Sequence, residues 1–367
     1  MPAGERFDVD WRPALLFEPS GSRLKCTLCP IGCALADGQV GACKVRRRSG
    51  DGGETATFAT SVRHRDVIER KPFYHFRPGS ETLTVAAPGC SFRCDYCINF
   101  RLSQFGRDEQ AEWHAEPVDA GELAREAAAA GAAVAFSYTE PSLALELTLA
   151  VAEAGAPLGV DVVWKSNGYL TEEAVRLVAP VLAAVNIDVK GSDDARHREL
   201  TGAPVRPVFA ALGLFRELGV WAEVSTPLIP GVSSASADLA AIAREIAAVD
   251  PDIPWHLLRY TPTYRRSGDQ PTAPEALAEA VRIGRDAGLK HVYVERALGE
   301  AGRTTGCPSC GTAVVERAVW GEVHSRLSGG ACPACGTTVA GRWETAGLRR
   351  TQELRRTQEH SETVRGR

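Results

Sequence analysis

Between residues 82 and 296 the chain alternates short apolar runs with longer amphipathic segments. The six apolar runs have the length of β-strands and lie at 82–88, 132–138, 161–166, 185–189, 220–228 and 255–260. The amphipathic segments have helical periodicity and lie at 120–130, 143–154, 171–181, 208–218, 237–248 and 274–287. This alternation predicts an α/β fold with a parallel sheet covered by helices. Periodicity alone leaves open whether the sheet is doubly wound or curves into a partial or full barrel.

Eleven cysteines fall into three groups: four before the alternating region, three inside it and four after it. An odd number cannot be wholly paired in disulfides, and the C-x2-C and C-x3-C spacings are typical of metal ligands. The charged N-terminus lacks the apolar run of a signal peptide, and no stretch approaches the roughly 20 apolar residues of a membrane span. We therefore expect a cytoplasmic protein with no membrane partner. The net charge of −4 argues against a globally basic nucleic-acid binder.

The central cysteines Cys90, Cys94 and Cys97 form a C-x3-C-x2-C motif directly after the first predicted strand. Loops at the carboxyl ends of parallel strands are where α/β barrels build active sites. Three thiolates can hold three irons of a cubane [4Fe-4S] cluster, which leaves the fourth iron open to a substrate or cofactor. A structural zinc site would need a fourth cysteine or histidine, and none lies within ten residues on either side. The motif therefore predicts a catalytic iron–sulfur cluster.

With Tyr96 in its aromatic position, the motif resembles that of the radical SAM superfamily. The resemblance implies that the open iron binds S-adenosylmethionine (SAM). It further implies that an electron from the cluster cleaves SAM to a 5′-deoxyadenosyl radical, which abstracts hydrogen from a substrate. In this interpretation the three cysteines are catalytic cluster ligands, and Tyr96 is a cofactor-binding residue.

Further motifs follow the later strands and add to this resemblance. Glu140, in Tyr-Thr-Glu-Pro, resembles the Gly-Gly-Glu-Pro variant of activating enzymes, which implies contact with the SAM ammonium. Asn167 lies in a segment similar to their Thr-Asn-Gly. Asp188 and Lys190 match Asp-x-Lys, so that Lys190 would neutralise the SAM carboxylate and Asp188 would help to place the cofactor. His256, on the sixth strand, could approach the ribose or the substrate. A single residue of this kind is often a turn, cap or packing residue, so the prediction depends on all of them converging.

Over roughly residues 20–315 the chain resembles the radical SAM enzymes of AmmeMemoRadiSam systems, which are related to pyruvate formate-lyase activating enzyme. The motifs that carry this resemblance lie at 26–46, 66–80, 227–231, 291–294 and 307–311. The resemblance implies a partial (β/α)6 barrel and a protein, peptide or other macromolecular substrate. It also implies an electron donor such as flavodoxin or ferredoxin, and Memo-like and AMMECR-like partners. The chain departs from the family at Ile98 and at Glu295-Arg296, where the family has glutamine and Gly-Asn, so its substrate can differ from the family norm.

Two cysteine quartets flank the central region. The N-terminal quartet consists of Cys26, Cys29, Cys33 and Cys43. Its spacing is compatible with tetrahedral zinc and with an auxiliary iron–sulfur cluster, and we favour zinc. The C-terminal quartet consists of Cys307, Cys310, Cys332 and Cys335. It forms two Cys-Pro-x-Cys-Gly knuckles, which predict a zinc ribbon.

We therefore expect four segments: a four-cysteine module at 1–80, a radical SAM core barrel at 81–300, a zinc ribbon at 301–346 and a disordered or helical charged tail at 347–367. A radical SAM enzyme that modifies RNA and docks through the ribbon is a competing hypothesis, although the ribbon's arginines are scattered along its sequence. The motifs are also compatible with a catalytically inactive zinc and iron–sulfur binding protein, and with an electron-transfer protein that has several clusters.

Overall fold

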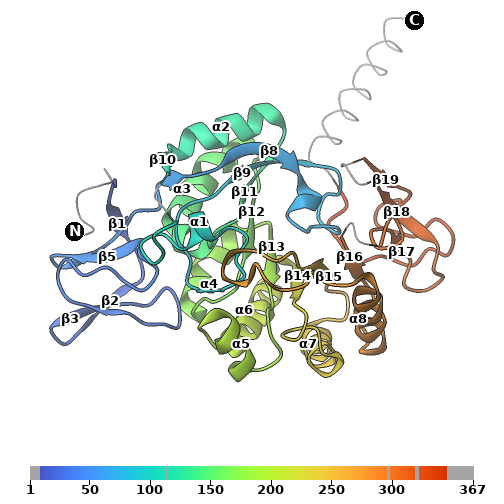
Figure 1. Cartoon of the computed structure of the whole chain (residues 1–367). Helices are drawn as coiled ribbons and strands as arrows, with labels where there is room; N and C mark the ends of the chain where they lie inside the picture. Colours follow the sequence, from blue (N-terminus) through green and yellow to red (C-terminus); the bar gives the residue numbers. More distant parts are fainter. Residues whose placement is uncertain (1–8, 112–113, 296–297, 319–321, 345–367) are drawn as a thin grey trace, which may run out of the picture.

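The centre of the protein is an eight-stranded sheet flanked by helices (Figure 1). It is seen in a computed structural model that describes residues 9–111, 114–295, 298–318 and 322–344. All six predicted strands are present. They are β9 (Glu81–Val85), β11 (Ala133–Phe136), β12 (Val162–Ser166), β13 (Ala184–Asp188), β14 (Trp221–Leu228) and β15 (Trp255–Arg259). Two edge strands were not predicted: β16 (Val292–Val294), parallel to β15, and β8 (Arg63–Val67), antiparallel to β9.

The strand order identifies the kind of sheet. The spatial order is β16-β15-β14-β13-β12-β11-β9-β8, so each parallel strand is added on the same side as the one before it. A doubly wound sheet reverses direction at a switch point, and this sheet does not. The edge strands β8 and β16 do not pair with each other in the part of the chain that the structure describes. The fold is therefore the expected partial barrel, and the doubly wound alternative is wrong.

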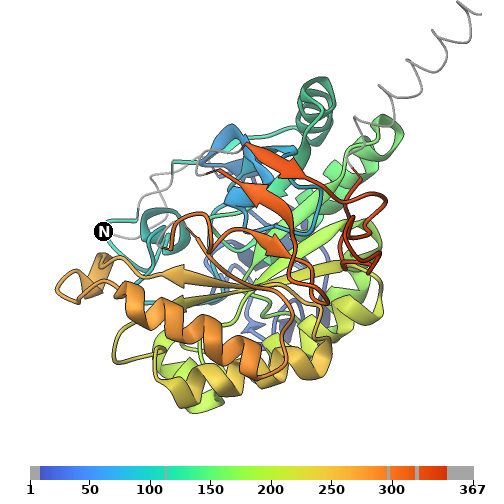
Figure 2. The same cartoon turned by 90° about the vertical axis from the view of Figure 1, so that its right-hand side faces the viewer.

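Six helices return the chain between the strands, as the periodicity predicts. They are α2 (Ala120–Ala130), α3 (Leu145–Gly155), α4 (Glu172–Val178), α6 (Arg206–Glu217), α7 (Ser236–Val249) and α8 (Pro274–Asp286). Local signals explain their ends: Thr171 caps α4 by accepting a hydrogen bond from the backbone N–H of Ala174, and Gly131 ends α2 in the left-handed conformation. Figure 2 shows α7 and α8 side by side along the outside of the sheet. Two short helices were not predicted, α1 (Phe100–Ser103) and α5 (Asp194–Thr201).

The chain before the barrel forms small antiparallel sheets. One contains β1 (Arg12–Ala14), β6 (Gly52–Thr55) and β5 (Arg46–Ser49), and another contains β2 (Phe17–Ser20), β3 (Arg23–Cys26) and β4 (Ala34–Leu35). A separate pair joins β7 (Ala59–Thr60) to β10 (Glu116–Pro117). The N-terminal module thus lies against the barrel at the left of Figure 1. The domain boundary at residue 80 stays a prediction, and β8, which precedes it, belongs to the barrel sheet.

The chain after the barrel forms a three-stranded sheet of β17 (Thr305–Gly306), β18 (Ala313–Arg317) and β19 (Val323–Ser325). The strands β18 and β19 form the hairpin between the two cysteine knuckles. The predicted charged tail lies outside the described residues. Among the described helices, none is long and apolar enough to cross a membrane.

Candidate active site

The three central cysteines lie on the loop that follows β9, at the carboxyl edge of the sheet. Cys94 is buried, and Cys90 and Cys97 are partly buried. The backbone N–H of Phe92 lies 3.3 Å from Cys90 Sγ, and Ser103 Oγ lies 3.3 Å from Cys97 Sγ. Burial raises the pKa of Cys94 to about 12, although the Lys190 ammonium opposes the shift. Buried thiols of this kind become thiolates when a metal binds them, so the donor set fits an iron–sulfur cluster.

Tyr96 lies within the same loop and is also buried. Its ring meets that of Tyr260, which follows β15, edge to face at 6.4 Å between centroids. Burial raises the pKa of Tyr96, so its hydroxyl stays neutral. The aromatic residue of the motif therefore connects the cysteine loop to the far side of the barrel mouth.

Glu140 lies after β11 and is 1% exposed. Its Oε1 accepts hydrogen bonds from Ser142 N (2.9 Å) and Ser166 Oγ (2.7 Å). Its Oε2 accepts one from Asn167 N (2.8 Å). Burial raises the pKa of this carboxyl, and these hydrogen bonds oppose the shift. A carboxylate has about four acceptor positions, so the chain occupies three and leaves about one for a cofactor.

The turn that delivers Glu140 is strained at Tyr138. This residue has φ of +70°, a conformation that glycine adopts freely and tyrosine rarely. It occupies the position of the first glycine in the activating-enzyme motif. Its ring packs 5.8 Å from that of His64, with the Lys71 ammonium 5.1 Å from its centroid. Tertiary packing thus holds a conformation that the local sequence does not favour.

Asn167 joins the loop after β12 to the cysteine loop. Its Nδ2 donates to Ser91 Oγ (2.9 Å) and lies 3.7 Å from Cys90 Sγ. Its Oδ1 accepts from Tyr169 N (2.9 Å), which fixes the orientation of the amide. Together with Glu140 and Cys90, this side chain brings three consecutive strand ends to one place, as the motifs predict.

Asp188 and Lys190 lie at the end of β13, with the Lys190 Nζ 2.9 Å from Asp188 Oδ2. A second ammonium, that of Lys165 on β12, bonds the other carboxylate oxygen and also donates to Asn186 Oδ1 (2.8 Å). Burial would raise the pKa of Asp188, but the two ammonium groups outweigh it and hold the pKa at about 2. The carboxylate is therefore ionised at neutral pH, and the group of three carries one net positive charge.

No role for Lys165 follows from sequence reasoning alone. A signal was present, because a lysine in an otherwise apolar buried strand needs a partner. Burial lowers the pKa of Lys165, and Asp188 opposes that shift. The structure shows that Lys165 and Lys190 share one carboxylate, each through a different oxygen, and that both lysine side chains are slightly exposed at the mouth.

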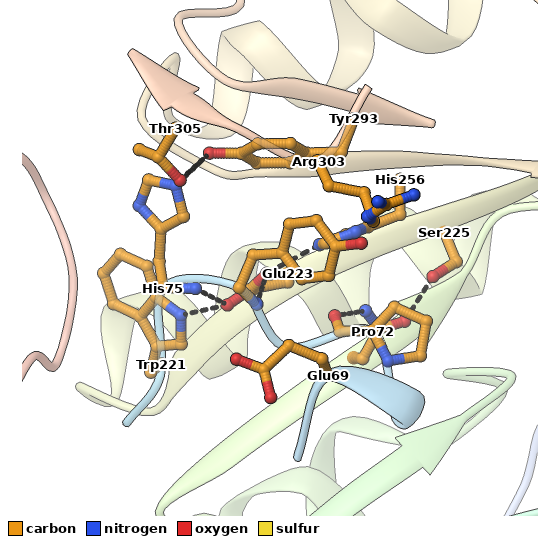
Figure 3. A network of polar contacts seen from close by, with 12 residues as sticks. Glu69, Pro72, His75, Trp221, Glu223, Ser225, His256, Tyr293, Arg303 and Thr305 are labelled. Atoms are coloured by element: carbon orange, nitrogen blue, oxygen red, sulfur yellow. Dashed lines mark hydrogen bonds and ion pairs between the residues drawn. The ribbon is translucent and has the colours of Figure 1, made fainter. Parts of the chain in front are cut away.

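His256 is not brought to these residues. It is fully buried on β15, and its Nε2 donates to Glu223 Oε2 at 2.6 Å (Figure 3). Its ring also meets Tyr74 edge to face, with centroids 4.8 Å apart. Its Nε2 therefore serves a buried network, and the expected approach to a ribose or substrate stays a prediction. The hydrogen bond between His256 and Glu223 depends on strand register, because the pairing of β14 with β15 places Glu223 within reach of the histidine.

The network around His256 belongs to a segment that fills the amino end of the barrel. This segment, residues 68–79, is here called the plug. The Glu223 carboxylate accepts from the backbone N–H groups of Tyr74 (2.9 Å) and His75 (2.8 Å) (Figure 3). Arg77 pairs with Asp161, which immediately precedes β12. The plug thus closes the end of the barrel opposite the cysteine loop.

The C-terminal quartet gathers into one cluster. The four Sγ atoms lie within 4.8 Å of one another, with Cys307 3.6 Å from Cys335 and Cys310 3.7 Å from Cys332. Its strands pack on the plug, because Arg317 bonds the Tyr74 carbonyl and places its guanidinium 4.3 Å from that ring. Arg326 pairs with Glu316. These arginines thus have internal partners, which gives no support to RNA docking.

The N-terminal quartet lies at the opposite end, beside the cysteine loop. Its four cysteines line one pocket together with Arg46 and Leu143, a residue of the short helix after Glu140. The guanidinium of Arg107, for which the sequence offers no signal, joins the two loops. It bonds the carbonyls of Ala42 and Cys90, the latter at 2.9 Å.

Comparison with known proteins identifies the family. The model of the radical SAM superfamily matches residues 84–243. An uncharacterized protein of Methanocaldococcus jannaschii is 30% identical over 317 residues, which cover 84% of this chain and 92% of that protein. The isethionate sulfite-lyase activating enzyme of Nitratidesulfovibrio vulgaris is 32% identical over 136 residues, 36% of this chain and 44% of that enzyme.

Among solved structures, a domain of pyruvate-formate lyase-activating enzyme from Bacteroides vulgatus has a TM-score of 0.39 and 21% identity. The match covers 44% of this chain and 98% of that domain. The family match includes the cysteine loop and the strand ends that carry Glu140, Asn167 and Asp188. The chain therefore belongs to the radical SAM superfamily and is an enzyme of the radical SAM type.

Proposed function

We propose that this enzyme cleaves SAM reductively at a [4Fe-4S] cluster held by Cys90, Cys94 and Cys97 and abstracts hydrogen from a protein or peptide. The observation that carries the proposal is the position of Asn167. Its side chain contacts the cysteine loop, while its backbone N–H donates to Glu140. A cluster ligand and the expected cofactor ligands are therefore held in one hydrogen-bonded unit.

In this proposal the bound cluster and SAM supply a reductive bond cleavage that generates a hydrogen-abstracting radical. The chain's own residues bind SAM and orient it. The partly exposed Lys190 ammonium binds the SAM carboxylate, and Asp188 holds that ammonium in place. The remaining acceptor position of Glu140 takes the SAM ammonium. Tyr96 covers the mouth on the side of Tyr260 and limits access of water.

The similarity to isethionate sulfite-lyase activating enzyme supports a protein substrate, with hydrogen abstraction from a glycine as the model reaction. We propose flavodoxin or ferredoxin as the electron donor. The motifs at 26–46, 66–80 and 307–311 support membership of an AmmeMemoRadiSam system with Memo-like and AMMECR-like partners. The compact C-terminal quartet supports a structural zinc ion.

The test is anaerobic reconstitution of the full chain with iron and sulfide, followed by SAM and dithionite. We expect 5′-deoxyadenosine and methionine, and none from Cys94→Ala. In equilibrium binding, Lys190→Met should weaken SAM binding by about tenfold or more, since it removes a charged hydrogen bond of about 1.5–3 kcal/mol. The matched control is Lys290→Met, whose ammonium pairs with Asp252 before β15, at the amino edge. A loaded wild-type protein that yields no 5′-deoxyadenosine would refute the proposal.

A further inference from the structure

The C-terminal quartet shows how this chain arranges four sulfurs for a single ion. Tetrahedral zinc has Zn–S distances of about 2.3 Å, which place neighbouring sulfurs about 3.8 Å apart. In this quartet the Cys307 and Cys335 sulfurs lie 3.6 Å apart and the Cys310 and Cys332 sulfurs 3.7 Å apart, which matches the spacing around a zinc ion. All four sulfurs lie within 4.8 Å of one another.

The N-terminal quartet has a different geometry. Cys26, Cys29, Cys33 and Cys43 are all described, and no three of their sulfurs lie within 4.8 Å of one another. The four surround a pocket with room for a water-sized sphere. Four sulfurs at the corners of a zinc tetrahedron lie only about 2.3 Å from its centre, which leaves room for the ion but not for a water-sized sphere. The quartet is therefore too wide for one tetrahedral ion.

The cluster-binding motif after β9 provides an internal comparison. Cys90, Cys94 and Cys97 also fail to bring three sulfurs within 4.8 Å, although all three are described. In a cubane each thiolate binds a different iron at a different corner, so the sulfurs stand farther apart than around one ion. The N-terminal quartet thus shares the wider spacing of the iron–sulfur motif.

The surroundings of the quartet also suit a cluster. Its pocket is walled by Leu28, Ile31, Leu35 and Leu143, and three of the four cysteines are buried. The backbone N–H of Ala42 donates to Cys33 Sγ at 3.4 Å, the kind of contact that stabilises a cluster-bound thiolate. Arg46 lines the same pocket, and its positive charge, which is paired with the Glu146 carboxylate at 3.0 Å, also acts on Cys43.

We propose that Cys26, Cys29, Cys33 and Cys43 hold a second [4Fe-4S] cluster in place of the zinc favoured from sequence. All four irons then have a protein ligand, so this cluster has no open position and does not bind SAM. It lies next to the first cluster site. Gly89 permits this approach, because a Cβ there would meet Val45 Cγ2 at 2.9 Å and the Cys43 carbonyl at 3.1 Å.

The test counts metals in the full-length protein after anaerobic reconstitution. Wild type should contain about eight irons, about eight acid-labile sulfides and about one zinc per chain. The variant Cys90→Ala/Cys94→Ala/Cys97→Ala should keep about four irons and four sulfides. Its reduced protein should give an electron paramagnetic resonance signal that SAM does not change. A wild type with about four irons and two zincs, or a triple variant without iron, overturns the proposal.

Two variants separate the sites. Cys29→Ala/Cys33→Ala leaves only two of the four N-terminal thiolates, so it should lower the iron content from about eight to about four and leave the SAM-sensitive signal of the first cluster. Cys310→Ser should remove zinc and leave the iron content unchanged. Iron that is unaffected by Cys29→Ala/Cys33→Ala, with zinc reduced in its place, contradicts the proposal. Because these counts need no turnover, they are independent of whether the enzyme cleaves SAM.

Discussion

Replacing Glu223 by glutamine should destabilise the barrel measurably. The carboxylate accepts four hydrogen bonds, from Tyr74 N (2.9 Å), His75 N (2.8 Å), Trp221 Nε1 (3.0 Å) and His256 Nε2 (2.6 Å). A glutamine offers one acceptor oxygen with two positions and adds an NH2 donor. At least two of the four buried donors then lose their acceptor, at about 1–3 kcal/mol each. The free energy of unfolding should therefore fall by about 2–6 kcal/mol.

Equilibrium urea unfolding under anaerobic conditions, followed by far-ultraviolet circular dichroism, measures this loss. The matched control is Glu245→Gln on the exposed side of α7, which should stay within about 0.5 kcal/mol of wild type. Iron content is determined for each protein, so that cluster loss is not mistaken for a change in the network. If the free energy of unfolding of Glu223→Gln lies within about 1 kcal/mol of the wild-type value, the four hydrogen bonds do not stabilise the barrel as reasoned.

Three more outcomes follow from other contacts in the structure. His197 on α5 is fully buried, and its Nδ1 lies 2.6 Å from the Ala203 carbonyl oxygen. This burial holds the pKa of His197 at about 4, below its usual 6.5, so its stabilising contribution is present above pH 6.5 and is lost as the pH falls toward 4. Lowering the pH from about 7 to about 5 should remove about 2 kcal/mol of unfolding free energy in urea titrations, and His197→Gln should show a shallower dependence. Arg107→Ala, which frees the cysteine loop from Ala42, should lose its visible cluster absorbance several-fold faster with chelator than Arg101→Ala, an exposed control. Cys310→Ser should speed hydrogen exchange at Tyr74, because Arg317 carries the ribbon's contact to the plug.

The strands and helices of the barrel were predictable because burial imposes a simple period on them. Central strands such as β12 and β13 are buried along almost their whole length and begin with apolar residues, and amphipathic helices separate them. The strand β8 was missed because it is an edge strand with charged residues: Arg63 pairs with Glu126, and Arg65 pairs with Glu81. The helix α5 was missed because few of its residues are apolar.

Within the site, residues next to a strand end could be predicted, and residues that depend on register could not. Asn167 follows β12 directly and Glu140 lies in the turn after β11, so the parallel sheet brings them together. His256 lies inside a strand, and its partner Glu223 depends on the pairing of β14 with β15. The spacing of Cys26 and Cys43 along the chain likewise does not reveal the distance between their sulfurs. That distance depends on how the N-terminal sheets fold.

The plug and the ribbon meet across a very long stretch of chain. His75 Nδ1 bonds the Ala340 carbonyl across 265 residues, and Arg317 bonds the Tyr74 carbonyl across 243. Contacts of such high sequence separation form late in folding. During synthesis the plug leaves the ribosome long before the ribbon exists. The plug at the amino end of a nascent barrel therefore lacks its contacts with the ribbon until the C-terminal cysteines emerge. We expect docking of the ribbon to be the final folding step. The supply of metal to Cys307 and its three partners should then set how long the plug remains accessible to chaperones and proteases.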